Sequence, residues 1–382
     1  MTDPLMQDRV QLARRVYDFG LTLEDLGPRQ HGRAAAVPRG ALPIGWPEGL
    51  APNPTELTVE PATDEPLPRA DYLVITWTAA EMVGLADVLT PGVNPRTRWY
   101  RYDHRFDEYL PKIRKGAPSR IAQRLGSWYP IKIGNRTVVC FKSELHLNQD
   151  GVRTAPGRAS LPVVDLFLQL IEEVRPKLVI TVGTAGATFA DAQLGDVIVT
   201  RAAKFRLADE FRSEPFAKRA FRCDQTVPRK HLKHAKAIMD RFAVNIREPD
   251  FGPPTTAYDF PAGLLPGVAN SPDIKLDGRD FEAFHPMLST DFFEFGNSVN
   301  GLEREGCGVE MGDAALGMAC ERLGANAPRW LVVRNMSDPQ INGVLPTAPV
   351  DMQAHWAVWY YETYGYWTSV NSAVACWALL AR

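Results

Sequence analysis

The chain has 382 residues, of which 45% are hydrophobic and 23% charged, and its formal net charge is −2. This composition is typical of a globular protein with a sizeable core. The small net charge and the absence of long Lys/Arg runs argue against nucleic acid or an anionic membrane as the main partner, and favour a small-molecule ligand.

Signals for targeting, metals and disulfides are weak. The five cysteines are scattered and lack CxxC spacing, so no metal site, cofactor or disulfide framework is indicated and a reducing, cytoplasmic location is expected. The first residues, MTDPLMQDRVQLARR, are too polar and acidic for a signal peptide. No apolar run approaches the roughly 18 residues of a membrane span.

Residues 1–70 are expected to stand apart from a regular domain over residues 71–382. Residues 1 to about 26 carry apolar side chains at helical spacing and predict one amphipathic helix. The following segment, including GALPIGWPEGLAPNPTELTVEP, has too many prolines for a helix or a central strand. We expect an arm along the core or a neighbouring subunit. A disordered linker is the alternative.

The regular domain alternates strands with helices. The expected elements, in chain order, are the strand DYLVITW, the helix AAEMVGLADVL, a hairpin IKIGNRTVVCFK turning at Gly134-Asn135, the helix LPVVDLFLQLIEEV, the strands KLVITV and DVIVTRAAKF, the helix HLKHAKAIMDRFAV, an irregular insertion at about 247–285, the strand-to-helix segment GVEMGDAALGMACERLG, the strand RWLVVRNM, and a long aromatic helix from about Asp351. This alternation predicts an α/β fold with a mostly parallel sheet covered on both faces.

Ligands of such sheets bind at the carboxyl ends of the strands, here near Trp77, Gly183 and Met336. The Gly183-Thr-Ala-Gly186 stretch would let a ligand approach the backbone. It is neither a GxGxxG fingerprint nor a P-loop, so neither a dinucleotide nor a nucleoside triphosphate is indicated. A tight turn without a ligand is the alternative.

Carboxylates follow two of these strands. Ser337 and Asp338 lie just past the run WLVVRNM, where partial desolvation would raise the pKa of the Asp338 carboxyl. A helix cap or an Asp-Pro turn would explain Asp338 equally well. Glu81 follows TWTAA, and with Thr78 it also matches a capping box, which is a purely structural role.

Two further segments carry candidate residues. GVEMGDAALG places Glu310, Met311 and Asp313 at a strand-to-helix junction, although methionine there is more often core and an acidic residue often only favours the helix dipole. STDFFEF has two adjacent phenylalanines, either of which can stack on a flat ring or pack in the core.

The order of these motifs is more informative than any one of them. A strand with a downstream Glu, then VGTAG with LGDVIV, S-x-D-x-F, VEM and VVRxxSD resembles the nucleoside phosphorylase and nucleosidase superfamily, and within it the methylthioadenosine/S-adenosylhomocysteine nucleosidase branch. The resemblance covers about residues 71–382, with insertions at 92–125 and 247–285. It implies a three-layer α/β sandwich with a mixed, mostly parallel central sheet, in a homodimer or higher homo-oligomer.

The resemblance also implies a reaction, hydrolysis of the N-glycosidic bond of a purine nucleoside or a related nucleoside. Asp338 would hand a proton to the departing base, and Glu81 would activate the attacking water. The implied substrate-binding residues are Thr184, Ala185, Gly186, Phe293, Glu310, Met311, Asp313 and Ser337. Phe293 would stack on the base and Met311 would lie under the ribose.

Two departures from the family keep alternatives open. Phosphorylases of this superfamily carry an arginine where this chain has Thr181, which favours water over phosphate as nucleophile. The family pattern VEMEA has a second glutamate that binds the ribose hydroxyls, but here Gly312 takes its place and Asp313 is turned by about 100° on a helix. Four alternatives are open: Asp313 or Glu310 substitutes in a rearranged junction, the sugar is unusual, the chain is a non-catalytic nucleoside-binding protein, or it is a phosphorylase.

Overall fold

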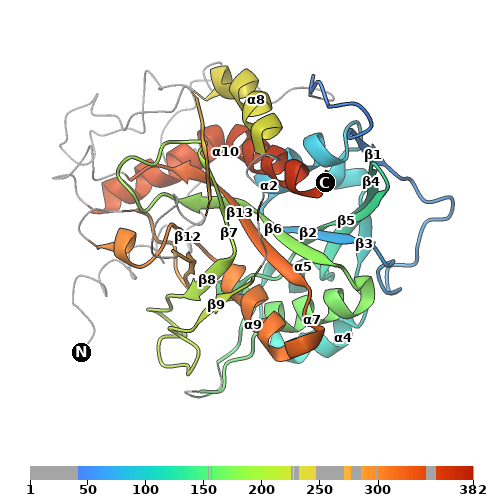
Figure 1. Cartoon of the computed structure of the whole chain (residues 1–382). Coiled ribbons are helices and arrows are strands. Elements are labelled where there is room, and N and C mark those ends of the chain that lie inside the picture. The colour runs from blue at the N-terminus through green and yellow to red at the C-terminus, as the bar shows by residue number, and fades with distance from the viewer. Residues whose placement is uncertain are drawn as a thin grey trace.

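A mixed β-sheet lies between two layers of helices in the computed structural model of the chain (Figure 1). The structure describes residues 42–153, 155, 157–224, 227, 232–246, 271–276, 285–296, 300–340 and 350–381. The expected α/β class with helices on both faces of the sheet is confirmed.

Parallel pairings occupy the centre of the sheet. Its main path runs through β1 (Pro52–Pro54), β4 (Gly126–Ile133), β5 (Arg136–Ser143), β2 (Tyr72–Thr76), β6 (Leu178–Gly186), β12 (Gly308–Glu310), β11 (Met287–Ser289), β8 (Ala202–Phe205) and β9 (Ala220–Arg222). Three strands join it from the side: β13 (Arg329–Asp338) pairs with β6 and with β7 (Val197–Thr200), β10 (Ile274–Leu276) pairs with β7, and β3 (Tyr100–Tyr102) pairs with β4. Strands β5, β2, β6 and β13 are mutually parallel, so their carboxyl ends meet at one edge.

Each face of the sheet has its own helices. Helices α2 (Ala79–Leu89), α8 (Leu232–Phe242) and α10 (Val350–Leu380) pack on one face, and α7 (Pro162–Val174) and α9 (Asp313–Leu323) on the other. The short helices are α3 (Pro95–Arg98), α4 (Phe106–Tyr109), α5 (Pro118–Ala122) and α6 (Leu147–Asp150). Side chains of β6 alternate between the two cores, with Ile180 and Val182 in one and Val179 in the other. The run is apolar throughout because both faces are buried.

Most of the predicted elements are found, and one is divided. The helix at 79–89 and the hairpin at Gly134-Asn135 are confirmed, and Gly134 takes the positive φ of 57° that the turn requires. The expected single strand at 196–205 is instead two strands on either side of Arg201. They have different neighbours: β7 pairs with β13 and β10, whereas β8 pairs with β11 and β9.

The Pro-rich segment lies along the core where it is described. Residues 52–54 form the edge strand β1, a position that tolerates proline because one side of the strand needs no ladder hydrogen bonds. Upstream, the Trp46 ring packs 4.5 Å from that of Trp377 in α10. The helix expected before residue 27 lies outside the described residues, as does most of the 247–285 insertion. None of the described helices combines the length and the apolarity that crossing a membrane requires.

Candidate active site

The GTAG and SD motifs lie inside strands and not beyond them. Strand β6 continues through Gly186 and β13 through Asp338, paired in parallel along their whole length with a bulge between Met336 and Asp338. The alternative of a tight turn at Gly183–Gly186 is therefore wrong, and the Asp338 carboxyl caps no helix among the described residues. An Asp-Pro turn starting at Asp338 would extend to residue 341, outside the described residues. The ladder persists because β13 and then β12 supply hydrogen-bond partners to the end of β6.

Asp338 has the features of a proton donor. Its side chain is buried, at 5% exposure, and its Oδ1 accepts a hydrogen bond of 2.9 Å from the Ser337 hydroxyl. Its Oδ2 is also buried and has no hydrogen-bond partner among the described residues. Burial raises the pKa of Asp338 to about 7, although the hydrogen bond from Ser337 acts in the opposite direction. The protonated form of this carboxyl is thus favoured far more than in an ordinary aspartate, and one of its oxygens has no partner among the described residues.

The two glycines of GTAG make room for charged side chains of the protein itself. A Cβ at Gly186 would lie 2.9 Å from Oδ2 of Asp338, and a Cβ at Gly183 would lie 2.4 Å from Oε1 of Glu81 and 2.5 Å from Nη1 of Arg334. The small residues at the end of β6 are thus required by the carboxyls that approach it.

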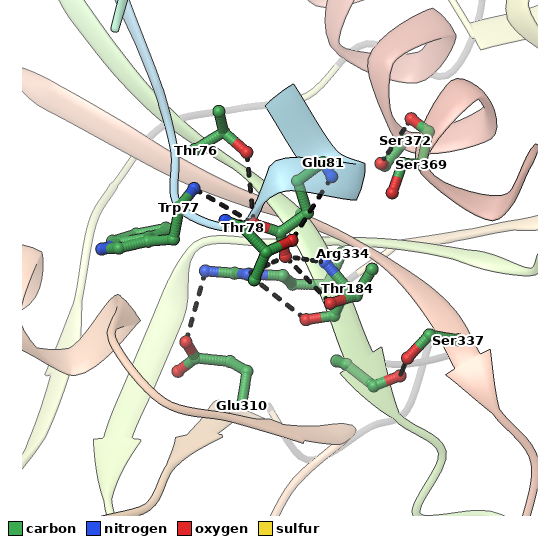
Figure 2. Close-up of polar contacts among 12 residues, drawn as sticks. Thr76, Trp77, Thr78, Glu81, Thr184, Glu310, Arg334, Ser337, Ser369 and Ser372 are labelled. Carbon is green, nitrogen blue, oxygen red and sulfur yellow. Dashed lines mark hydrogen bonds and ion pairs between the residues drawn. The ribbon is translucent and has the colours of Figure 1, made fainter. Parts of the chain in front are cut away.

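Glu81 joins the end of β2 to the end of β6. The predicted capping box is present, with Thr78 and Glu81 bonded reciprocally at the start of α2. The Oε2 atom of Glu81 accepts hydrogen bonds from Thr78 N at 2.8 Å, Trp77 N at 3.1 Å and Thr76 Oγ1 at 3.3 Å, and Oε1 accepts from N and Oγ1 of Thr184 at 2.8 and 2.9 Å (Figure 2). Both oxygens are thus engaged by protein donors.

The ionised form of Glu81 is favoured. Burial opposes its charge, but Arg334 and the backbone donors of Thr78 and Thr184 together outweigh burial and hold the pKa of Glu81 below its usual value. A general base works best with a pKa near the operating pH. Glu81 therefore has the environment of a hydrogen-bond acceptor more than that of a strong base.

Arg334 is the central residue that the sequence analysis did not assign. Its Nε and Nη2 donate to the two oxygens of Asp313 at 2.8 and 2.6 Å, Nη2 also donates to Glu310 at 3.2 Å, and Nη1 donates to the Thr184 carbonyl at 3.2 Å. Figure 2 shows Arg334 between Glu310 and Glu81, whose Oε1 is 3.6 Å from Nη1. The available signal was an arginine within the apolar run WLVVRNM, because a cation in a buried strand needs anionic partners.

Glu310 and Asp313 are both bound to the protein. Asp313 has no exposed surface and forms a two-point pair with Arg334. Glu310 accepts hydrogen bonds from the Asp313 amide at 3.0 and 3.1 Å and from the Ser289 hydroxyl, and so caps the start of α9. Burial and the neighbouring Asp313 charge raise the pKa of Glu310.

The space beside Gly312 is occupied by Trp77. A Cβ at Gly312 would lie 3.1 and 3.3 Å from two indole carbons of Trp77 and 3.6 Å from Oε2 of Glu310. The indole is fixed by its N–H, which donates to the Leu145 carbonyl at 3.1 Å, and by Arg334, which lies 4.9 Å from the ring centroid. Where the VEMEA pattern has a second glutamate, this chain thus has a glycine, and the Trp77 indole lies beside it.

The remaining candidate residues differ in solvent accessibility. Ala185 is buried in β6 and Thr184 is partly exposed. Met311, between β12 and α9, and Phe293, after β11, are both half-buried. Their contacts with a ligand stay predictions. Within the described part of the chain, no group of three or more His, Cys, Asp or Glu side chains is arranged to hold a metal ion.

Comparison with known proteins gives matches only among solved structures. No protein-family model matches the chain, and no curated protein does. The 5'-methylthioadenosine/S-adenosylhomocysteine nucleosidase of Neisseria meningitidis is 13% identical, with 81% of this chain and 99% of that chain covered and a TM-score of 0.40. A putative nucleosidase of the same name from Francisella philomiragia is 14% identical, covers 82% and 99%, and has a TM-score of 0.44.

Futalosine hydrolase of Helicobacter pylori is 12% identical, covers 81% of this chain and 97% of that chain, and has a TM-score of 0.42. At these identities and TM-scores, the likeness carries no conclusion about the function of this chain.

Proposed function

We propose that this chain hydrolyses the N-glycosidic bond of a nucleoside, in the first instance a purine nucleoside, with Asp338 as the acid. The observation that carries the proposal is the Asp338 carboxyl, which is buried, has a raised pKa, and presents an oxygen without a partner among the described residues. A carboxyl kept protonated by burial is suited to give a proton to a leaving group at neutral pH.

In the proposed reaction the bond between the sugar C1′ and the base nitrogen breaks, and the base takes the bonding electron pair. The Asp338 proton passes to the base and neutralises the developing negative charge. A water oxygen bonds to C1′, which carries positive charge in the transition state, and the proton that this oxygen loses passes to solvent water, from which the Asp338 carboxylate regains a proton. Proton transfer by a positioned side chain is typically worth 10² to 10⁴ in rate. The products are free base and free sugar, and no co-substrate besides water is needed.

Glu81 has a modified role in this proposal. Three of its hydrogen bonds come from backbone amides, which are fixed, whereas those of Thr76 and Thr184 come from hydroxyls that can rotate. If the Thr184 hydroxyl turns away, Glu81 can accept a hydrogen bond from one water. Its lowered pKa makes it a weak proton acceptor, so it would orient the water, and the electron demand of C1′ would drive the attack.

Water is favoured over phosphate by the state of the nearby cations. Thr181, at the position of the phosphorylase arginine, is fully buried in the middle of β6. Arg334 is committed to carboxylates, and Lys142, at the end of β5, is paired with Glu144. A phosphate nucleophile needs unengaged cations or a cluster of backbone amides, and these two side chains do not provide them.

The direct test is to incubate the purified chain with purine and pyrimidine nucleosides, with and without phosphate, and to measure released base by chromatography. We expect release without phosphate that is abolished in the Asp338→Asn variant. Release only with phosphate would establish a phosphorylase. Binding of a nucleoside without release would establish a non-catalytic member of the fold. The expected homodimer is a separate proposal, which light scattering of the purified protein tests.

A further inference from the structure

We infer that none of the carboxylates described around Arg334 recognises the 2′-hydroxyl of the sugar, and that the substrates therefore include 2′-deoxynucleosides at least as readily as ribonucleosides. The inference rests on the proposed function and specifies its substrate class. It depends on what the carboxylates around Arg334 already bind.

A carboxylate recognises a hydroxyl by accepting its hydrogen bond, so it needs an accessible oxygen that the protein has not already engaged. Asp338 is assigned to the base. Besides Asp338, the carboxylates within 4 Å of Arg334 among the described residues are Glu81, Glu310 and Asp313.

Asp313 and Glu310 are not available. Asp313 is fully buried and gives both oxygens to the guanidinium of Arg334. Glu310 is 7% exposed and receives the Asp313 amide, the Ser289 hydroxyl and Nη2 of Arg334. Turning either carboxylate toward a sugar would take a partner from Arg334 in the protein interior, where an unpaired charge is costly.

Glu81 can serve one ligand hydroxyl at most. Its side chain is 3% exposed, and three backbone amides occupy most of its acceptor sites. In the proposed reaction the remaining site holds the attacking water. A sugar hydroxyl and that water would therefore compete for the same acceptor.

The shape of the site agrees with this result. A Cβ added at Gly312 would point at the Trp77 indole and lie 3.1 and 3.3 Å from two of its ring carbons. A longer acidic side chain at this position would need the indole to move, and the indole is held by Leu145, Arg334 and a ring contact with Phe167. The site is therefore built without a carboxylate at residue 312.

The chemistry of the sugar turns this arrangement into a measurable preference. A 2′-hydroxyl withdraws electrons and disfavours the positive charge that develops at C1′. Glycosidases commonly offset this effect with hydrogen bonds to that hydroxyl that strengthen in the transition state. A site without such a bond should process the 2′-deoxy compound as fast as the ribo compound or faster.

The test is to measure kcat/KM for two matched pairs, adenosine with 2′-deoxyadenosine and inosine with 2′-deoxyinosine. We expect the deoxy compound of each productive pair to equal or exceed its ribo partner. A kcat/KM that is reproducibly higher for the ribo compound overturns the inference; a site built to bind that hydroxyl would reject the deoxy analogue by about 10⁴ to 10⁵.

A binding measurement on the Asp338→Asn variant separates the two proposals. Calorimetry with the same four nucleosides should give Kd values within tenfold for each pair. Tighter binding of the ribo compound by more than tenfold overturns the inference while leaving hydrolysis intact. If wild-type protein releases no base and the variant binds none of the four, the proposed function fails and the inference fails with it.

Discussion

At the scale of single residues, the pKa values of two carboxyls of the candidate site are shifted in opposite directions because their partners differ. Asp338 is buried and, among the described residues, accepts a hydrogen bond from the Ser337 hydroxyl alone; burial raises its pKa. Glu81 is buried beside Arg334 and several amides, and its pKa is lowered. Two carboxyls whose pKa values are shifted apart in this way are typical of sites in which one group gives a proton and the other stays charged.

The pH dependence of activity follows from the Asp338 carboxyl. Because the proposed acid must be protonated, kcat/KM should be highest below a pH of about 7 and fall as the pH rises through that value, the pKa of Asp338 in the folded chain. In the Asp338→Asn variant, kcat should be about 10² to 10⁴ times lower, and the fall of activity around pH 7 should disappear. Rates of base release between pH 5 and 9 check both, and a wild-type profile that rises with pH would contradict the assignment.

Asp338 should also make stability depend on pH. Its folded-state pKa, about 7, lies above its ordinary value of 3.8, so the stability it contributes is present at low pH and is lost as the pH rises toward 7. Each pKa unit corresponds to about 1.4 kcal/mol. The Asp338→Asn variant should therefore gain stability relative to wild type between pH 4 and pH 8. Urea unfolding of both proteins at pH 4 and pH 8 measures this gain. If the difference in unfolding free energy between variant and wild type is the same at both pH values, the pKa of Asp338 is not shifted.

At the scale of elements, the end of β6 depends on two glycines for different reasons. The Gly183→Ala variant would push a Cβ against Glu81 and Arg334, which are themselves fixed by other partners. Overpacking of this kind costs about 1–3 kcal/mol. The Gly186→Ala variant, which meets Oδ2 of Asp338 at 2.9 Å, should have the milder effect on stability and a strong effect on base release. Denaturation and activity assays compare the two, and the reverse ranking would exclude this explanation.

The start of α2 provides a second element-scale test. The Thr78 hydroxyl accepts a hydrogen bond from the Glu81 amide, and it also receives the Tyr361 hydroxyl of α10 at 3.0 Å. Thr78→Ala should lower the free energy of unfolding by about 1 kcal/mol, the usual value of an N-cap. Thr78→Ser, which keeps the hydroxyl, is the matched control and should stay close to wild type. Equal losses in both variants would mean that the methyl group, and not the cap, is responsible.

At the scale of the whole molecule, Arg334 connects elements that are far apart in the sequence. From β13 it reaches Asp313 of α9, Glu310 of β12, Glu81 of α2 and the Thr184 carbonyl of β6. One buried cation therefore holds the sheet and helices from both layers in register around the candidate site. Its partners are satisfied only in the complete tertiary structure.

Removing this cation should be among the most costly single changes. Arg334→Met leaves buried carboxylates without a counter-ion, for which a loss of about 3–5 kcal/mol is typical. Arg334→Lys keeps the charge but cannot form the two-point pair with Asp313, so an intermediate loss is expected. Urea unfolding of the three proteins checks the order, and an Arg334→Met variant as stable as wild type would show that the network contributes no net stability.

The sequence alone determined most elements and the edge of the sheet where the site lies. Apolar periodicity, the Thr78–Glu81 cap and the Gly134-Asn135 turn are local patterns, set by a few neighbouring residues, and the structure has each of them. The alternation of strands and helices was enough to place Glu81 and Asp338 at one edge, because parallel strands bring their carboxyl ends together.

Only the tertiary structure decided what each carboxyl can do. Charge and acceptor capacity depend on partners distant in sequence: Arg334 engages Glu81, Glu310 and Asp313, while no cation among the described residues shifts the pKa of Asp338. The continuation of β6 through Gly186 likewise depends on partners supplied by β13 and β12. Burial, Coulomb attraction and steric fit act through space. Spacing along the chain could therefore identify the acidic residues of the site, but it could not predict their charge or the partners that they bind.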